Sequence, residues 1–240
     1  FSSRRRHTRF RNVTGVQTCA LPISREARLA NLLFGSSNWG SYTSSLASLG
    51  NSSKGTQWNS AGAEPLTDLH ALLDVIRANA HGILPDTLVL GYGALRSLSR
   101  SADVRGFFTA GSTASGTAAG NRIMQDDMVV SVLKEVLGIP NVFVGSARRE
   151  TANAGLTSSE AQIWTDDSVF MGIMKGSDAV ANKNGTKVMP VAALNFEYEG
   201  FTSGSYDDLE MTKRTVWLEH KHQDKIIAQN YGFLLTDCLA

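Results

Sequence analysis

Cysteines, long apolar runs and catalytic motifs are scarce or absent in this sequence. Its two cysteines, Cys19 and Cys238, are too few for a disulfide framework in 240 residues, and neither has the spaced partner of a zinc or redox motif. No run approaches the roughly 18 apolar residues that a membrane-spanning helix needs. The sequence therefore predicts a protein with no metal, cofactor, catalytic residue or membrane segment, and one that is not an enzyme.

Acidic residues are missing from residues 1–24, which hold five of the 23 basic residues. The rest of the chain then has 18 basic and 22 acidic side chains, so its body is mildly acidic. This first segment contains the string VTGVQTCALPI, which resembles a translated sequencing-adapter tail. We therefore expect residues 1–24 to be non-native and the natural N-terminal part to be absent. The alternatives are an arginine-rich nucleic-acid arm, a transit peptide and a secretory signal.

The remaining composition, with 42% hydrophobic and 19% charged residues overall, is typical of one globular domain or two small lobes. Helical spacing of apolar residues predicts helices over 25–34, 65–81, 94–99, 101–108 and 124–137. Short apolar runs predict strands over 87–90, 141–147, 163–164, 168–174, 191–198, 212–222 and 225–235. Helices that precede mostly antiparallel strands predict an α+β fold.

Two stretches between these elements are rich in small and polar residues. Residues 35–62 form a predicted long loop that carries Trp39, Tyr42 and Trp58. These aromatic side chains are candidate anchors against a neighbouring subunit, because interfaces favour Trp and Tyr; the alternative is that they cover the chain's own core. Residues 109–120 predict an exposed mobile loop.

The short motifs that chemistry requires are incomplete. Gly91-x-Gly93 follows a predicted strand but lacks the third glycine and the acidic residue of a dinucleotide site. Ser131-x-x-Lys134 lies inside an amphipathic helix without the companion motifs of penicillin-recognising enzymes. His220 and His222 share one strand face but have no third metal ligand at a suitable spacing. The acidic doublets Asp166-Asp167 and Asp207-Asp208 are expected in turns.

Several short segments recur in a familiar order along residues 25–240. They are Arg28–Phe34 with Asn38-Trp39, Trp58 ahead of Pro65 and Asp68-Leu69, Pro85–Gly91, Leu137–Ala147, Ile163-Trp164 and Tyr231–Thr236. This order resembles the major capsid proteins of tailed bacteriophages, whose Hong Kong 97-type fold is shared by encapsulin nanocompartments. The resemblance implies an axial lobe and a peripheral lobe, with the N-terminal arm and extended loop of the family absent here.

By this resemblance the axial lobe would comprise residues 64–195 and 225–240. The peripheral lobe would comprise residues 25–63, which include the end of a long helix and a loop, and the strands of residues 196–224. Candidate subunit-interface residues are Trp39, Tyr42, Trp58, Gly111 and Gly116. The two glycines lie in the small-residue loop, which would sit where subunits crowd around an axis.

The function that the resemblance implies is structural. Copies of the chain would form pentamers and hexamers of an icosahedral virion shell around the DNA genome, assembled in the bacterial cytoplasm. Scaffold, portal or decoration proteins are the expected partners, without sequence-specific nucleic-acid binding or a membrane. An encapsulin-like compartment shell is the first alternative, and a small hydrolase built on Ser131 or the His220/His222 pair is the second.

Overall fold

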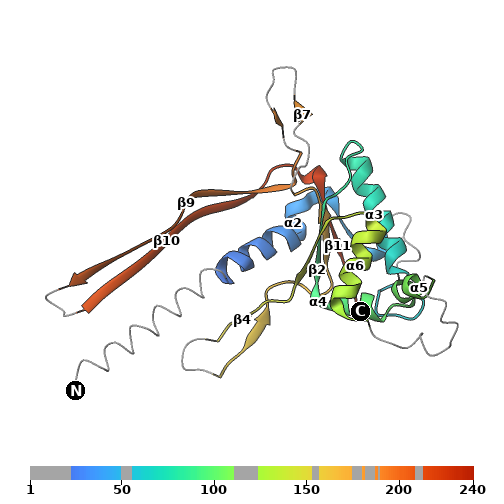
Figure 1. Ribbon diagram of the computed structural model, residues 1–240, viewed down its shortest axis with the longest axis horizontal. Helices are drawn as coiled ribbons and strands as arrows, with labels where there is room; N and C mark the ends of the chain where they lie inside the picture. Colours follow the sequence, from blue (N-terminus) through green and yellow to red (C-terminus); the bar gives the residue numbers. More distant parts are fainter. Residues whose placement is uncertain are drawn as a thin grey trace.

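A mixed β-sheet forms the centre of the molecule. A computed structural model describes residues 23–49, 56–110, 124–152, 157–174, 180–181, 187–188, 190–208 and 213–240. The sheet contains β1 (Thr43–Ser45), β2 (Thr87–Gly91), β3 (Asn141–Gly145), β6 (Val169–Gly172) and β11 (Gly232–Thr236). Their order is β1-β11-β6-β2-β3 (Figure 1). The pairs β1/β11 and β2/β3 are parallel, and the pairs β11/β6 and β6/β2 are antiparallel.

The inner strands are mostly apolar because both faces of the sheet are covered. Every residue of β2 and β6 is buried, and so are the first four residues of β11. On one face, Leu88 and Leu90 pack in a large cluster with α3 (Pro65–Asn79), α4 (Tyr92–Arg100) and α6 (Asp126–Leu137). The short α5 (Ala102–Ala110) adds Val104 to the same cluster. These helices lie together on one side of the sheet (Figure 1).

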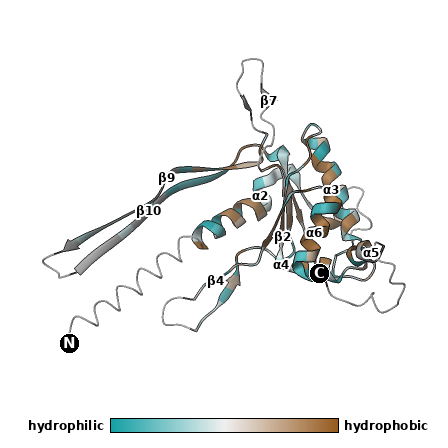
Figure 2. Ribbon diagram, viewed as in Figure 1, coloured by the Kyte–Doolittle hydropathy of each residue, from teal (hydrophilic) through white to brown (hydrophobic). Residues whose placement is uncertain are grey.

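The opposite face carries a smaller cluster. Val89, Phe170 and Leu234 alternate with the residues of the first face, as expected for strand side chains. A helix over residues 23–34 contributes Ala30 and Leu33, and α2 (Ser36–Trp39) contributes Trp39. Figure 2 shows apolar colour concentrated on the central strands and on the helices that cover them. The sheet therefore separates two cores.

Local sequence explains where the helices begin and end. α3 starts with Pro65, whose missing N–H costs nothing in a first turn, and Asp68 lies in that turn. It ends before Gly82, which has φ +86° and donates its N–H to the Arg77 carbonyl at 2.8 Å. Gly138, with φ +67°, ends α6 in the same left-handed region.

Three two-stranded hairpins lie outside the central sheet (Figure 1). The longest pairs β9 (Ala193–Asp208) with β10 (Lys213–Ile226), and we call it the ribbon. The second pairs β4 (Arg148–Glu150) with β5 (Glu160–Gln162), and the third pairs β7 (Val180–Ala181) with β8 (Lys187–Val188). Short 3-10 turns η1 (Gly40–Tyr42), η2 (Leu46–Ser48) and η4 (Gln229–Tyr231) complete the described part.

The structure confirms the α+β class and differs from the predicted elements in several places. The predicted long loop of residues 35–62 contains α2, η1, β1 and η2, and β4 and β5 lie outside the predicted strands. Ile163 and Trp164 form a bend instead of a strand, because the Trp164 ring lies across Gly145 of β3. The predicted strand over 225–235 is divided by η4 into the end of β10 and β11. The strands expected to end at 198 and to begin at 212 belong to the ribbon, where β9 continues through residues 207–208 that we expected in a turn.

The two predicted lobes are joined by strand pairing. β1 comes from residues 25–63, assigned to the peripheral lobe, and it pairs with β11, from residues 225–240 of the axial lobe. The lobe boundaries remain a prediction. Residues 1–22 and most of the small-residue loop, residues 111–120, lie outside the described residues. Within the described residues, no helix is long and apolar enough to cross a membrane.

Candidate assembly surfaces

Trp39, one of the predicted interface anchors, is fully buried inside its own chain. Its Nε1–H donates to the Leu33 carbonyl at 2.8 Å, and its ring lies 4.8 Å from the ring of Phe170. The sequence leaves open whether Trp39 covers the chain's own core, and the structure places Trp39 in that core. The expectation that this side chain contacts a neighbour is corrected, because it has no exposed surface.

Trp58 is buried in the other core. Its Nε1–H donates to Oδ2 of the buried Asp68 at 3.0 Å, and its backbone N–H donates to the Cys238 carbonyl at 2.8 Å. Its indole therefore ties the 56–64 segment to α3 and cannot reach another subunit. Tyr42 is half-buried and packs against both clusters. Gly111 and Gly116 lie outside the described residues.

The residues of the weaker chemical motifs are not gathered in one site. Ser131 is exposed on α6, and its hydroxyl donates to the Asp127 carbonyl one turn earlier at 2.9 Å. The His222 side chain is 4% exposed on the ribbon, with Nε2 at 4.0 Å from Asp224 Oδ2. Among the described residues, no group of three or more His, Cys, Asp or Glu side chains is arranged to hold a metal ion.

Gly91 and Gly93 serve the packing of a turn. A Cβ on Gly91 would lie 2.2 Å from the Thr165 carbonyl oxygen, so only glycine fits there. The Gly93 N–H donates to Asp166 Oδ1 at 3.1 Å, and the Ala94 N–H donates to the Asp166 carbonyl at 2.9 Å. Asp166 thus occupies the N-terminal end of α4, where a negative charge is favoured.

The ribbon is the longest surface feature, and no third strand pairs with it in the described chain. Its cross-strand register runs from Ala193/Ile226 to Asp208/Lys213, with an irregularity where His220/Phe201 gives way to Lys221/Tyr198. Figure 1 shows the ribbon extending away from the sheet beyond the 23–34 helix. Isolated two-stranded ribbons are marginally stable in water, so this one needs support along its length.

The two faces of the ribbon differ. At its base, Ile226 packs against the smaller core cluster, and the side chains of His222 and Asp224 on the same face are 4% and 12% exposed. The other face is open: Phe196, Tyr206 and Trp217 are 51%, 58% and 45% exposed. The register places these three aromatic side chains on this one face. A Cβ on Gly204 would meet the Trp217 ring at 2.6 Å, so the glycine lets the indole lie across the ribbon.

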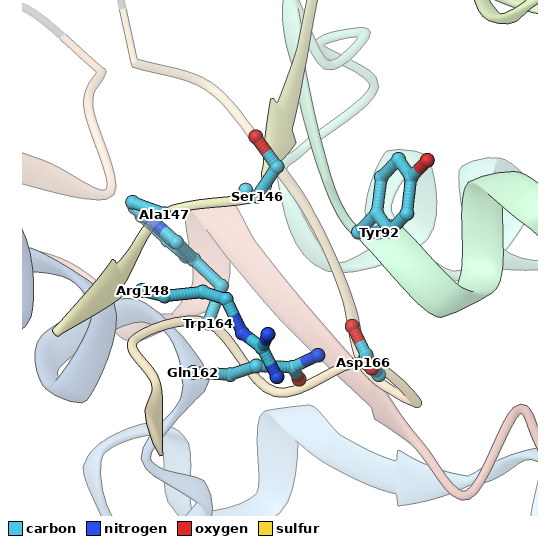
Figure 3. A pocket seen from close by; sticks show the side chains of 8 residues that line it. Tyr92, Ser146, Ala147, Arg148, Gln162, Trp164 and Asp166 are labelled. Carbon is cyan, nitrogen blue, oxygen red and sulfur yellow. The ribbon is translucent and has the colours of Figure 1, made fainter. Parts of the chain in front are cut away.

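A cavity of about 480 Å³ lies at the end of β3. One wall comes from residues Gly145–Arg148, and the other comes from Gln162, Trp164, Asp166 and Tyr92. Figure 3 shows the Arg148 guanidinium and the Gln162 amide lying together, with the Trp164 ring beside Ala147 and Asp166 on the far side. Arg148 also forms a surface ion pair with Glu160 at 3.7 Å.

Next to the cavity, the β4–β5 hairpin is closed by hydrogen bonds to Glu150. Its carboxylate accepts bonds from the Ser158 hydroxyl, from the Ala152 N–H at 2.9 Å and from the Ser159 N–H at 2.7 Å. These donors lower the pKa of Glu150, because they stabilise the ionised form. In the larger core, burial raises the pKa of the Cys238 thiol, and the nearby Asp167 and Asp68 add to the effect.

Sequence reasoning missed the open face of the ribbon and the cavity. Alternation of apolar and polar residues in TVWLEHKH is a strand signal that could have indicated the face. The cavity has no sequence signal, because its residues come from three separate segments.

Among solved structures, this chain is similar to a phage-related protein from Bordetella bronchiseptica RB50. The TM-score is 0.68 at 16% sequence identity, and the match covers 95% of this chain. It covers 66% of that protein, so this chain spans just under two thirds of its length. At this identity the likeness shows a shared fold. No protein-family model matches the chain, and no curated protein does.

Proposed function

We propose that this chain is a structural protein of a tailed bacteriophage, and specifically a major capsid protein that has no enzymatic activity. Copies of it would assemble into the icosahedral shell around the DNA genome in the bacterial cytoplasm. The shared fold with a phage-related protein supports the phage setting. The ordered resemblance to tailed-phage capsid proteins supports the finer assignment.

The observation that carries this proposal is the open aromatic face of the ribbon. Three aromatic side chains at least 45% exposed on one two-stranded hairpin are unfavourable in a separate molecule. Covering the exposed apolar surface of these side chains would stabilise an interface by roughly 25 cal/mol per Å² removed from water. A neighbouring copy that covers this face would bury the three aromatic side chains and hold the two subunits together.

Such a contact is suited to a closed ring. The ribbon is one surface, and the body that would receive it is another, so the interface between copies would be heterologous. Heterologous contacts close into rings when the rotation between copies allows it. Pentamers and hexamers of a shell are rings of this kind, and scaffold, portal or decoration proteins would act on the assembled ring.

The proposal is tested by expressing the full chain and examining it by sedimentation velocity and negative-stain electron microscopy. We expect rings or shells whose amount rises with protein concentration. The matched variant shortens the ribbon: residues 199–220 are replaced by Asn-Gly, which joins the register partners Tyr198 and Lys221 in a two-residue turn. We expect this variant to keep the thermal transition of the central sheet and to sediment as a monomer.

The control for the aromatic face is Leu84→Ser, because Leu84 is 58% exposed and lies in the loop before β2, outside the ribbon. This variant should assemble like the natural sequence. A full chain that sediments as a monomer at every concentration would contradict the proposal. Assembly that survives removal of the ribbon would keep a shell role but remove its main support.

A further inference from the structure

The body of the molecule has one uncovered apolar position close to the cavity. Phe143 on β3 is 56% exposed, although its register partner Val89 is 6% exposed. β3 is an edge strand, and the Phe143 side chain lies on the face that carries Val89 and Phe170. The cover of that face therefore stops short of the β3 edge.

The cavity lies on the same face, two residues further along the strand. Phe143 and Gly145 point the same way along β3, and a Cβ on Gly145 would collide with the Trp164 ring of the cavity wall. Phe143 and the cavity wall at Gly145 are therefore two residues apart along β3, a separation of roughly 7 Å. The Arg148 guanidinium and the Gln162 amide, which lie together in the lining, both carry hydrogen-bond donors (Figure 3).

The charges of this surface favour a carboxylate. Asp166, the acidic residue of the cavity, accepts a hydrogen bond from the Gly93 N–H at the N-terminal end of α4 and lies on the far side from Arg148 (Figure 3). The Arg148 ion pair with Glu160 is exposed, with 57% and 58% of the side chains accessible, and such pairs contribute little. Arg148 can therefore exchange Glu160 for a second carboxylate at little cost.

The open face of the ribbon carries the complementary pattern. Trp217 and Glu219 are alternate residues of β10, both exposed, and they are on the same face as Phe196. Next on that face is Lys221, whose Nζ lies 3.2 Å from Glu219 Oε1. Read along the strand, the ribbon offers an aromatic ring, an acid and a base. The other surface offers the aromatic ring of Phe143, the base Arg148 and the acid Glu160.

We propose that the open face of the ribbon of one copy docks on the β3 edge of a second copy, with Trp217 against Phe143 and Glu219 at Arg148 and Gln162. Lys221 then faces Glu160, so two exposed ion pairs become one alternating set of four charges. This inference rests on the proposed function, because it names the two surfaces that meet when copies assemble. It assigns a role to the cavity, which receives a side chain from the neighbouring copy.

The test is an exchange of charges between the two surfaces of the full chain. Arg148→Glu and Glu219→Arg each place like charges in contact, and we expect each to raise the concentration needed for half-assembly by about tenfold or more. The double variant Arg148→Glu/Glu219→Arg restores the attraction, so its assembly should return close to that of the natural sequence. An equal mixture of the two single variants should form oligomers in which the variants alternate, seen by native mass spectrometry.

The matched controls are Arg149→Glu, which changes the neighbouring exposed arginine outside the cavity lining, and Glu135→Arg on the exposed surface of α6. Both should assemble normally, and thermal unfolding of every variant reports whether it is folded. If the natural chain assembles and the single exchanges have no more effect than the controls, the docking inference is overturned and the shell proposal stands. Weakened single variants without restoration in the double variant also overturn it. A natural chain that remains monomeric overturns both.

Discussion

Gly145 shows how one residue without a side chain positions a functional surface. It lies where β3 ends and the Trp164 ring crosses the strand, and Trp164 in turn donates its Nε1–H to Glu26 Oε1 at 2.8 Å. The Phe34 ring meets Trp164 edge-on at 5.3 Å. A single glycine therefore allows the 23–34 helix, the bend after β5 and the cavity wall to meet.

Replacement of this glycine should be costly. In Gly145→Ala, the new Cβ would lie 2.2 Å from Trp164 Cγ, so the indole must move and leave its partners. We expect a loss of about 1–3 kcal/mol in the free energy of unfolding, measured by denaturant titration. Gly106→Ala is the control, because a Cβ there meets nothing within 4 Å and alanine favours the helix α5 by up to about 1 kcal/mol. Equal stability of the two variants would contradict the packing described.

The buried Cys238 thiol makes a second prediction, which concerns pH. Burial raises the pKa of the folded thiol above that of the unfolded chain, so stability from this group is complete below the unfolded thiol pKa, about 8.5. As the pH rises above that value, the unfolded chain loses the proton while the folded chain keeps it, and stability falls. Denaturant titrations between pH 7 and 10 should show this decline.

In Cys238→Ala, the part of the decline that belongs to the thiol should disappear, although the variant is less stable at every pH because a buried atom is lost. The comparison uses the slopes, which other titrating groups affect equally in both proteins. A thiol reagent provides a separate measurement: it should modify Cys238 only under unfolding conditions. Identical slopes would mean that the thiol does not remain protonated in the folded chain.

At the scale of elements, the ribbon is predicted to be the least protected part of the described chain before assembly. Its outer part has one face open and no third strand, whereas β2 and β6 are buried on both faces. We expect amide hydrogens of residues 213–219 to exchange orders of magnitude faster than those of residues 87–90 in unassembled protein. Mass spectrometry after assembly should show strong slowing in the ribbon. Equal protection of both segments in the monomer would contradict this.

The elements that the sequence predicts well are those with repeated apolar spacing. The helix at 65–79 and the buried strand at 87–91 appear where leucine, isoleucine and valine recur, because their burial decides the structure. The ribbon was harder to predict, because the glycine, serine and aspartate residues near 199–208 are typical of a turn. There, pairing with β10 overrides local preference, and the Trp217 ring covers Gly204.

The candidate site was predicted only in part, for a reason that lies in tertiary structure. Trp39 and Trp58 stand in a polar stretch, and sequence cannot tell whether such aromatics face their own core or a neighbour. Their indole N–H groups find the Leu33 carbonyl and Asp68, which only the folded chain brings close. Trp217 and Phe143, in contrast, lie on predicted strands, but their exposure depends on how far the covering helices extend.

At the scale of the whole molecule, the central sheet unites distant parts of the sequence. β11 lies between β1 and β6, so residues 232–236 separate a strand near residue 44 from one near residue 170. β9 and β10, by contrast, are joined directly and can pair as soon as both exist. The molecule thus combines a local hairpin with a core of high sequence separation, which slows folding.

The central position of β11 has a consequence during synthesis. A ribosome adds this strand after the other four strands of the sheet, and until residue 236 has emerged β1 is not joined to β6 and Phe170, Val169 and Leu46 lack part of their cover. The ribbon precedes β11 in the chain, so it can pair before the central sheet is complete. The two cores can therefore close only after β11 has paired with β1 and β6.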